Sequence, residues 1–411
     1  MQASDYEVRS QLDWSREGFF DFCPNTKAFD YRNAYWLAAM SYYSYLNPTY
    51  LEQIFSTPYR QRLTLQLRNE NGNPTEKRRL FGLGWKGHFD FFSNATGPHP
   101  KKFDILSLGK DVTPDVQAFW IDSPELIVVS FRGTEEDNPI DWITDFTASL
   151  QLDELSLPFW RRNVHKGFEK SVTILTPWLE KRISDLYRRY PDASSIPVFL
   201  TGHSMGGALA VMVMTNWLER NQKVPPRLRL NLKAVYTFGA PRIGSLDYAR
   251  YFLNLTVKEP VGLYRIVNRR DIVTKAPCIQ YNHFGTHVQL LSDLQGNFPA
   301  QNVSILINPR SEEFNHCGWG TQITDNLNNI DQYTKDHALE SYYSVLLTAR
   351  RELTRALAYQ GRFERSQGLT PNPVEHSSGI SASCQPRRIF APSAPAYLQH
   401  NFRFLPFELE Y

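Results

Sequence analysis

The chain has 411 residues, enough for one large α/β domain with insertions or for two smaller domains. Hydrophobic residues make up 42% of it, charged residues 21%, and its mean hydropathy is −0.43, which argues against a disordered or membrane-embedded chain. No segment is long and apolar enough to span a bilayer, and a formal net charge of +3 is too small to indicate nucleic acid as a partner.

Cysteine usage and the first residues bear on the compartment. The cysteines lie far apart without a Cys-x-x-Cys pair, which argues against zinc sites or a disulfide framework and favours free thiols: Cys23, Cys278, Cys317 and Cys384. Residues 1–14 contain no apolar run, so no signal peptide of the usual kind is visible. We expect a cytoplasmic protein, with export by a route that leaves no cleavable signal as the alternative.

The first third of the chain contains a helix, an irregular region and a hairpin. Apolar and aromatic residues at helical spacing predict a helix over 29–46. Residues 68–114 are interrupted by Gly, Pro and Asn and are interpreted as an insertion or elaborated loop. The β-branched and aromatic runs 117–121 and 126–131 flank a short polar turn, which predicts a hairpin.

Helices and strands alternate through the middle of the chain. Helices are predicted over 170–189 and 208–221, and strands over 197–201, 233–238 and 262–268. This alternation predicts an α/β fold with a mostly parallel central sheet and helices on both faces.

A long amphipathic helix is predicted over 335–362, before a tail rich in Pro and Ser. Its arginines, Arg350 among them, are interpreted as a solvated helix surface, with attraction to anionic lipid as the alternative. We therefore expect a single domain over 1–367 and a weakly ordered tail over 368–411.

Ser204 stands in the pattern that carries the most chemical information. The apolar run ending at Thr201 leads into Gly202-His203-Ser204-Met205-Gly206-Gly207 and then into a helix rich in Ala and Met. A serine hydroxyl is a poor nucleophile, so it has to be exposed at a sharp turn, deprotonated by a base and paired with donors for the oxyanion. Gly-x-Ser-x-Gly between a strand and a helix is the pattern of such a turn, whereas the bare pentapeptide arises often by chance.

The chain resembles the fungal-type, or class 3, lipase family of the α/β-hydrolases. The segments that carry the resemblance occur in the family's order within 117–343: 130–134 (SFRGT), 164–168 (VHKGF), 202–207 (GHSMGG), 237–244 (TFGAPRIG), 264–273 (YRIVNRRDIV), 281–285 (YNHFG) and 336–337 (DH). The resemblance implies an α/β-hydrolase fold and hydrolysis of lipid esters by a catalytic triad.

Asp271 is the candidate acid of the triad. It follows the predicted strand 262–268 at the carboxyl edge of the sheet, where α/β sites assemble, and the family's Asn-x-x-Asp-x-Val pattern falls on it. The competing interpretation is an ordinary turn residue or cap.

His337 is the candidate base among ten histidines. His203 adjoins the nucleophile and is expected to point elsewhere, and three others lie in structural motifs of the family: His165, His283 and His287. His316 also remains, but His337 is similar to the family's His-x-x-x-x-Tyr ending and preserves the order Ser, Asp, His. A core or surface histidine is the alternative.

Two backbone N–H groups are needed to hold the oxyanion. Met205, directly after the nucleophile, supplies one, and the resemblance assigns the other to Thr134, whose alternative is an exposed residue closing a strand. The resemblance also implies a lid within 135–160, where Trp142 either shields the pocket or simply packs on the rim of the core.

These residues predict a serine carboxylic ester hydrolase that cleaves acylglycerols or related lipid esters through an acyl-enzyme and contacts a lipid interface transiently. Ser204, His337 and Asp271 would act as nucleophile, base and acid, with no metal or cofactor. Two alternatives stay open: a catalytically silent lipase-like scaffold, and a phospholipase or thioesterase with the same triad.

Overall fold

The computed structural model describes residues 22–46, 48–57, 62–68, 74–81, 85, 87–94, 115–133, 164–277, 281–293, 301–308, 335–339 and 341–350. Most of the predicted elements fall within these ranges. The expected lid over 135–160 and the expected tail over 368–411 lie outside them.

An eight-stranded sheet forms the centre of the molecule, in the order β10-β9-β8-β7-β6-β5-β4-β3. Its strands are β3 (His88–Ser93), β4 (Gln117–Asp122), β5 (Ile127–Phe131), β6 (Pro197–His203), β7 (Asn231–Phe238), β8 (Gly262–Asn268), β9 (Thr286–Asp293) and β10 (Gln301–Ile307). The five strands β5 to β9 pair in parallel, and the strands at both edges pair antiparallel. The predicted mostly parallel sheet and the 117–131 hairpin are thus confirmed.

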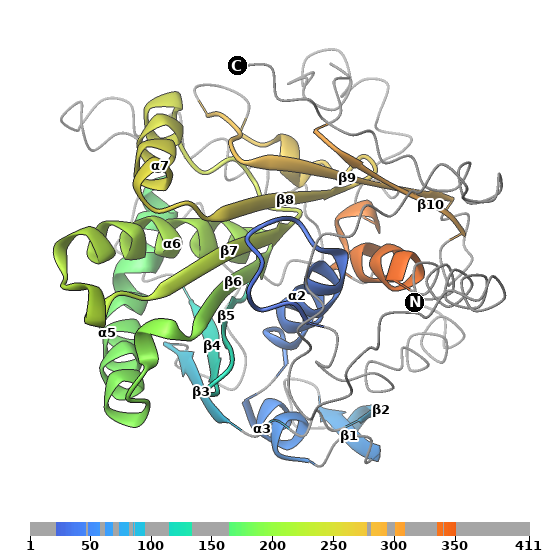
Figure 1. Cartoon of the computed structure of the whole chain (residues 1–411). Coiled ribbons are helices and arrows are strands. Elements are labelled where there is room, and N and C mark those ends of the chain that lie inside the picture. The colour runs from blue at the N-terminus through green and yellow to red at the C-terminus, as the bar shows by residue number, and fades with distance from the viewer. Residues whose placement is uncertain are drawn as a thin grey trace, which may run out of the picture.

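Helices cover both faces of this sheet (Figure 1). One face carries α5 (Lys166–Arg189), α6 (Met205–Lys223) and α7 (Leu246–Lys258), and the other carries α2 (Tyr31–Tyr43), α3 (Pro48–Ser56) and the helical residues 341–350. Short 3₁₀ turns lie at η3 (Ala193–Ser195), η4 (Pro226–Leu228) and η5 (Val273–Lys275), and β1 (Arg62–Arg68) pairs with β2 (Pro74–Phe81) in a separate antiparallel sheet.

Alternation along the strands divides the core into two layers. In β5, Ile127, Val129 and Phe131 pack on the side of α5, α6 and α7, whereas Val128 packs on the side of α2. Because successive strand side chains point to opposite faces, a strand buried on both sides is apolar throughout. This explains why the central strands could be predicted as uninterrupted apolar runs.

Helix α2 lies close against the middle of the sheet through small polar side chains. The Ser41 and Thr201 hydroxyls are 2.9 Å apart, and the Ser130 hydroxyl donates to the Met40 carbonyl at 3.0 Å. These hydrogen bonds join α2 to β6 and β5. They fix the end of α2 above the carboxyl ends of those strands.

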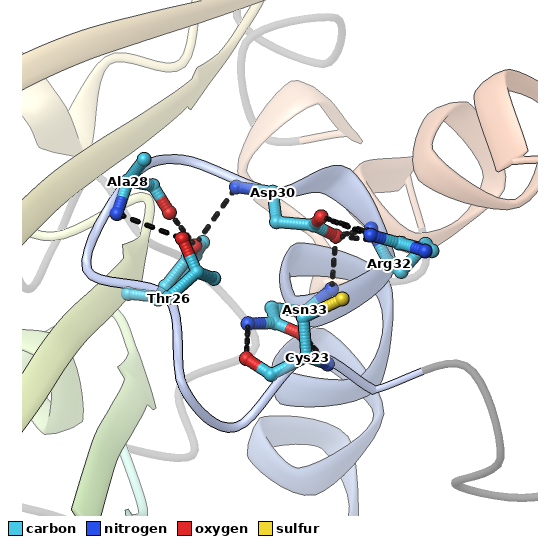
Figure 2. A network of polar contacts seen from close by, with 7 residues as sticks. Cys23, Thr26, Ala28, Asp30, Arg32 and Asn33 are labelled. Carbon is cyan, nitrogen blue, oxygen red and sulfur yellow. Dashed lines mark hydrogen bonds and ion pairs between the residues drawn. The ribbon is translucent and has the colours of Figure 1, made fainter. Parts of the chain in front are cut away.

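The segment 22–30 runs into α2 and is tied to it by polar contacts (Figure 2). Asp30 caps the helix by accepting from the backbone N–H groups of Arg32 and Asn33, and the Asn33 amide bonds both backbone groups of Cys23. Satisfying the first N–H groups of a helix in this way stabilises its start by about 1 kcal/mol.

Three expectations need correction. Strand β3 lies inside the range interpreted as an insertion, yet it is an edge strand of the main sheet. Cys23 is disulfide-bonded rather than a free thiol, and its partner cysteine lies outside the described residues. Disulfides are typical of oxidising compartments, which argues against the predicted cytoplasmic localisation, and that localisation stays a prediction. Arg350 is 4% exposed and stacks over the rings of Tyr35 and Trp36, so it does not belong to a solvated surface.

Among the helices in the described ranges, none has the length and apolar character that crossing a membrane requires.

Candidate active site

The candidate residues gather at the carboxyl ends of the parallel strands. Gly133 lies just beyond β5, Ser204 directly follows β6, Gly239 directly follows β7, and Asp271 follows β8. Neighbouring parallel strands end at one edge of a sheet, so residues far apart in sequence meet there.

Ser204 occupies a sharp turn between β6 and α6. Its backbone has φ 54° and ψ −130°, a left-handed region that non-glycine residues rarely adopt. The turn is possible because glycines flank it: a Cβ on Gly202 would lie 2.3 Å from the Gly206 carbonyl, and one on Gly206 would lie 2.1 Å from the Phe131 carbonyl. The start of α6 therefore packs directly on the backbone of β5 and β6, with Ser204 at the apex.

Asp271 and His337 form a buried acid–base pair. Both carboxylate oxygens of Asp271 lie 3.0 Å from Nδ1 of His337, and the two side chains are almost inaccessible to solvent. A carboxylate accepts hydrogen bonds, so Nδ1 carries the proton and the lone pair of the neutral ring is on Nε2. That tautomer is the one a general base requires.

Two further donors hold the carboxylate of Asp271. The Val273 backbone N–H donates to Oδ1 at 2.9 Å, and the Tyr342 hydroxyl donates to Oδ2. Burial, reinforced by the charge of Asp271, raises the pKa of Tyr342 well above 10, so its hydroxyl keeps its proton. Tyr342 thus holds the carboxylate oxygen that the Val273 N–H does not.

His337 is anchored through its neighbour Asp336. The Asp336 carbonyl accepts from the Asn268 amide at 3.0 Å, and its carboxylate accepts from the Arg270 N–H at 3.3 Å. Asp336 is 1% exposed. This clamp joins the short segment that bears His337 to the loop that bears Asp271.

His203 contributes to the site, contrary to the expectation that it points elsewhere. Its ring lies 4.5 Å from that of His337, and its Nε2 is 2.8 Å from the His337 carbonyl. Burial, followed by the electrostatic effect of the neighbouring His337, lowers the pKa of His203 well below 6.5. His203 is therefore a neutral ring packed against the candidate base.

Gly239 gives the acid–base pair the space it needs. With φ +61°, its missing Cβ would lie 2.6 Å from Oδ2 of Asp271 and 3.0 Å from Nδ1 of His337. A larger residue would displace both partners.

Of the predicted oxyanion donors and the lid residue, only Met205 lies in the described part of the chain. Met205 is the first residue of α6, where helix N–H groups and the helix dipole favour a developing anion. Thr134 and Trp142 lie outside the described residues. Within the part of the chain that the structure describes, no group of three or more His, Cys, Asp or Glu side chains is arranged to hold a metal ion.

Comparison with known families identifies the domain that bears the candidate nucleophile and acid. Residues 128–281 match the class 3 lipase family. The chain carries a class 3 lipase domain. The lipase domain has the α/β-hydrolase fold, and its matched span includes Ser204 and Asp271, while His337 lies beyond it.

Relatives of the lipase domain occur in plants and fungi. The chain is 29% identical over 273 residues to a triacylglycerol lipase of Ricinus communis, covering 55% of this chain and 48% of the relative. It is 33% identical over 156 residues to a lipase of Rhizomucor miehei, covering 38% and 39%, and 27% identical over 162 residues to a chloroplastic phospholipase A(1) of Arabidopsis thaliana, covering 37% and 33%. The chain thus spans about half or less of the length of these relatives.

Sequence reasoning overlooked the residues that surround the candidate triad. Tyr342 occupies the tyrosine of the His-x-x-x-x-Tyr pattern, so a signal for it was present in the sequence. Gly239 and His203 lie inside motifs, but their contacts with His337 depend on how distant strands end beside one another.

Proposed function

We propose that the protein is a serine carboxylic ester hydrolase that cleaves lipid esters, with acylglycerols as the principal substrates. The observation that carries the proposal is the combination of Ser204 on a strained strand-to-helix turn with a buried Asp271–His337 pair in the tautomer that a base requires. The match to the class 3 lipase family and the name of the Ricinus communis relative support the substrate class.

The reaction proceeds through an acyl-enzyme. His337 accepts the proton of the Ser204 hydroxyl on Nε2 as the serine oxygen attacks the ester carbonyl, and the carbonyl oxygen becomes an oxyanion. The N–H groups of Met205 and Thr134 stabilise that oxyanion. His337 then returns the proton to the departing alcohol. In the second half a water molecule, deprotonated by His337, attacks the acyl carbonyl, and the bond to Ser204 breaks as His337 returns that proton to the serine oxygen and the fatty acid leaves.

Asp271 supports the imidazolium that forms in each half of the reaction. Its carboxylate already holds three donors, from His337, Val273 and Tyr342, so no reorganisation is needed when His337 becomes charged. Preorganised electrostatic stabilisation of this kind is a large contribution to catalysis. We further propose that the protein contacts the surface of its lipid substrate transiently during turnover.

The second candidate is a phospholipase with the same triad. The name of the Arabidopsis thaliana relative, a phospholipase A(1), favours it. A phospholipid presents the same acyl ester as an acylglycerol, so the attack by Ser204 would be unchanged, and only the pocket around the head group would differ.

The test compares wild-type protein with Ser204→Ala and with the control Ser195→Ala, whose exposed serine lies in η3. We expect wild type and Ser195→Ala to hydrolyse p-nitrophenyl butyrate and octanoate and to react with a fluorophosphonate. Ser204→Ala should lose both properties, with kcat reduced by about 10⁶-fold. A folded wild-type protein that neither hydrolyses these esters nor takes the label would support the scaffold alternative instead.

Substrate class is then read by mass spectrometry on mixed lipid substrates. Trioleoylglycerol emulsions, phosphatidylcholine vesicles and acyl-coenzyme A are offered together, and free fatty acid is traced to its source. Release mainly from trioleoylglycerol supports the first candidate, and release mainly from phosphatidylcholine replaces it with the second.

A further inference from the structure

Tyr45 lies just past the end of α2, far from the other site residues in sequence, and reaches the nucleophile turn. Its hydroxyl is 2.9 Å from Nδ1 of His203, the residue that precedes Ser204. The side chain is partly buried, and its ring lies 5.9 Å from the His203 ring. Neither the sequence motifs nor the triad accounts for this contact.

The direction of the hydrogen bonds around His203 follows from their partners. Nε2 of His203 faces the His337 carbonyl, which can only accept, so Nε2 carries the proton. The ring is neutral, because burial keeps its pKa far below 6.5, and so Nδ1 is an acceptor. Tyr45 is therefore the donor, and a directed chain runs from the Tyr45 hydroxyl through the His203 ring to the His337 backbone.

Tyr45 also packs on the strand end that leads to the candidate oxyanion donor. A Cβ on Gly133 would lie 2.2 Å from the Tyr45 hydroxyl and 3.1 Å from Cβ of Ser204. The guanidinium of Arg132 lies 5.4 Å from the centre of the Tyr45 ring and bonds Gln117 on β4. The residue after Gly133 is Thr134, so Tyr45 packs on the segment that leads from β5 to the candidate oxyanion donor.

We propose that Tyr45 and His203 are positioning residues that hold the base, the nucleophile turn and the end of the segment 131–133 in fixed relative positions during ester hydrolysis. The proposal rests on the proposed function. It adds two residues that do not touch the reacting atoms but act through His337 and Gly133.

The chemistry explains why this pair is suited to that task. When His337 takes the proton of Ser204, a positive charge forms 4.5 Å from the His203 ring. A neutral His203 tolerates that charge, whereas a protonated one would repel it. The Tyr45 hydroxyl keeps the proton of His203 on Nε2, where it holds the His337 carbonyl, and so prevents the other tautomer from turning a lone pair toward that carbonyl.

The experiment uses full-length Tyr45→Phe, which removes one hydroxyl and keeps the ring. We expect kcat for p-nitrophenyl butyrate to fall about tenfold with KM changed by less than twofold, because alignment rather than binding is lost. The matched control is Tyr248→Phe, which removes a buried tyrosine hydroxyl bonded to Thr215 at the same 2.9 Å, away from the site. We expect its kcat to equal that of wild type.

A double-mutant cycle separates positioning from general support of the fold. His203→Phe keeps a ring beside His337 but has no nitrogen for Tyr45 to bond, so adding Tyr45→Phe in that background should change kcat by less than twofold. Equal tenfold effects in both backgrounds, or wild-type kcat in Tyr45→Phe, would overturn the inference while leaving ester hydrolysis intact.

Nitrogen NMR of protein labelled on histidine gives a readout that does not depend on activity. The inference requires His203 in wild type to be neutral with the proton on Nε2, and a partial shift to the Nδ1–H tautomer in Tyr45→Phe. A wild-type His203 protonated on Nδ1 contradicts it. Failure of the proposed function would appear differently, as wild-type protein that does not hydrolyse any ester.

Discussion

The nucleophile and the acid–base pair are built in two different ways. Ser204 is held by backbone contacts among residues 202–207, where glycines without a Cβ let α6 pack on the backbone of β5 and β6. Asp271 and His337 are 66 residues apart and are held by side-chain hydrogen bonds from several segments, among them those of Tyr342 and Asp336. One half of the site depends on steric fit, and the other depends on satisfied polar groups.

This difference predicts how each half fails. The turn around Ser204 has no room for an added atom, so even a small substitution there should disrupt the turn and lower the free energy of unfolding. The Asp271–His337 pair is held by several separate hydrogen bonds, so removing one of them should lower activity partly while the protein stays folded.

Within the acid–base half, the largest effect is expected from Asp271→Asn. The amide has one accepting oxygen instead of two, and when that oxygen stays with the Val273 N–H, its NH2 group donates to Nδ1. His337 would then carry its proton on Nε2, where the base needs a lone pair. We expect kcat to fall about 10⁴-fold. The melting temperature should change far less than activity, because the amide fills the same volume.

Fluorophosphonate labelling at two pH values supplies the control for Asp271→Asn. Labelling should recover at high pH, where hydroxide can replace the missing base. Retention of wild-type kcat would mean that Asp271 is an ordinary turn residue and would remove the acid from the proposed triad.

Alanine substitution of one glycine beside Ser204 and of one beside the Asp271–His337 pair compares the two halves of the site directly. In Gly202→Ala the new Cβ would meet the Gly206 backbone at 2.3 Å, so we expect a loss of about 3 kcal/mol in the free energy of unfolding. In Gly239→Ala it would meet Oδ2 of Asp271 and Nδ1 of His337, so we expect kcat to fall about 100-fold with a smaller loss of stability.

Gly285→Ala is the control for Gly239→Ala. Its φ is +81°, and its Cβ would meet the side chain and the carbonyl oxygen of Leu263 rather than the site. It should lower the melting temperature and leave kcat unchanged. Equal losses of kcat in both variants would mean that Gly239 acts through the fold alone.

The same distinction explains what the sequence could reveal. Ser204 and its glycines are adjacent in the chain, so the strand, the turn and the helix could all be predicted from one short segment. The α/β architecture was likewise predictable, because strands buried on both faces are apolar throughout. Asp271 was predictable from its place after β8.

Contacts between distant segments could not be predicted. Whether His203 faced the base depended on where residues 335–339 lie beside β6, and the role of Tyr45 depended on the anchoring of α2 by Ser41 and Ser130. Residues 88–93 contain three phenylalanines, a strand signal that the surrounding Gly, Pro and Asn outweighed, and their pairing with β4 makes them β3. Tertiary context decided these features.

His287 should make the acid–base half sensitive to acid. Burial and then the charge of Arg265 lower the pKa of His287 to about 4, whereas the unfolded chain binds the proton near 6.5. Its neutral ring therefore contributes stability that is complete above pH 6.5 and is lost as the pH falls toward 4. His287 contacts Gln289, which donates to the carbonyls of Val267 and Arg269 just before Asp271.

The variant His287→Asn tests this pH dependence, because an asparagine side chain cannot take up a proton in this range. The loss of unfolding free energy between pH 7.5 and pH 5 should be about 2 kcal/mol smaller than in wild type, from one proton over about 1.5 pH units. Urea titrations at both pH values measure this difference, and the pH 7.5 values serve as the reference for any change in packing. Equal losses in the two proteins would mean that His287 is already protonated in the folded state.

The smallest effect is expected from Tyr342→Phe, which removes one of the donors to Asp271 and leaves the ring in place. The carboxylate keeps the Val273 N–H and His337, so the pair should loosen without coming apart, and we expect kcat to fall about tenfold with KM nearly unchanged. Tyr343→Phe is the matched control, because it removes a buried hydroxyl bonded to Tyr35 from the next residue of the same helix. Both variants should lose similar stability in thermal unfolding, but only Tyr342→Phe should lose activity. If both lose activity equally, the acid–base half depends on the packing of the 341–350 helix rather than on its individual hydrogen bonds, and the distinction between the two halves disappears.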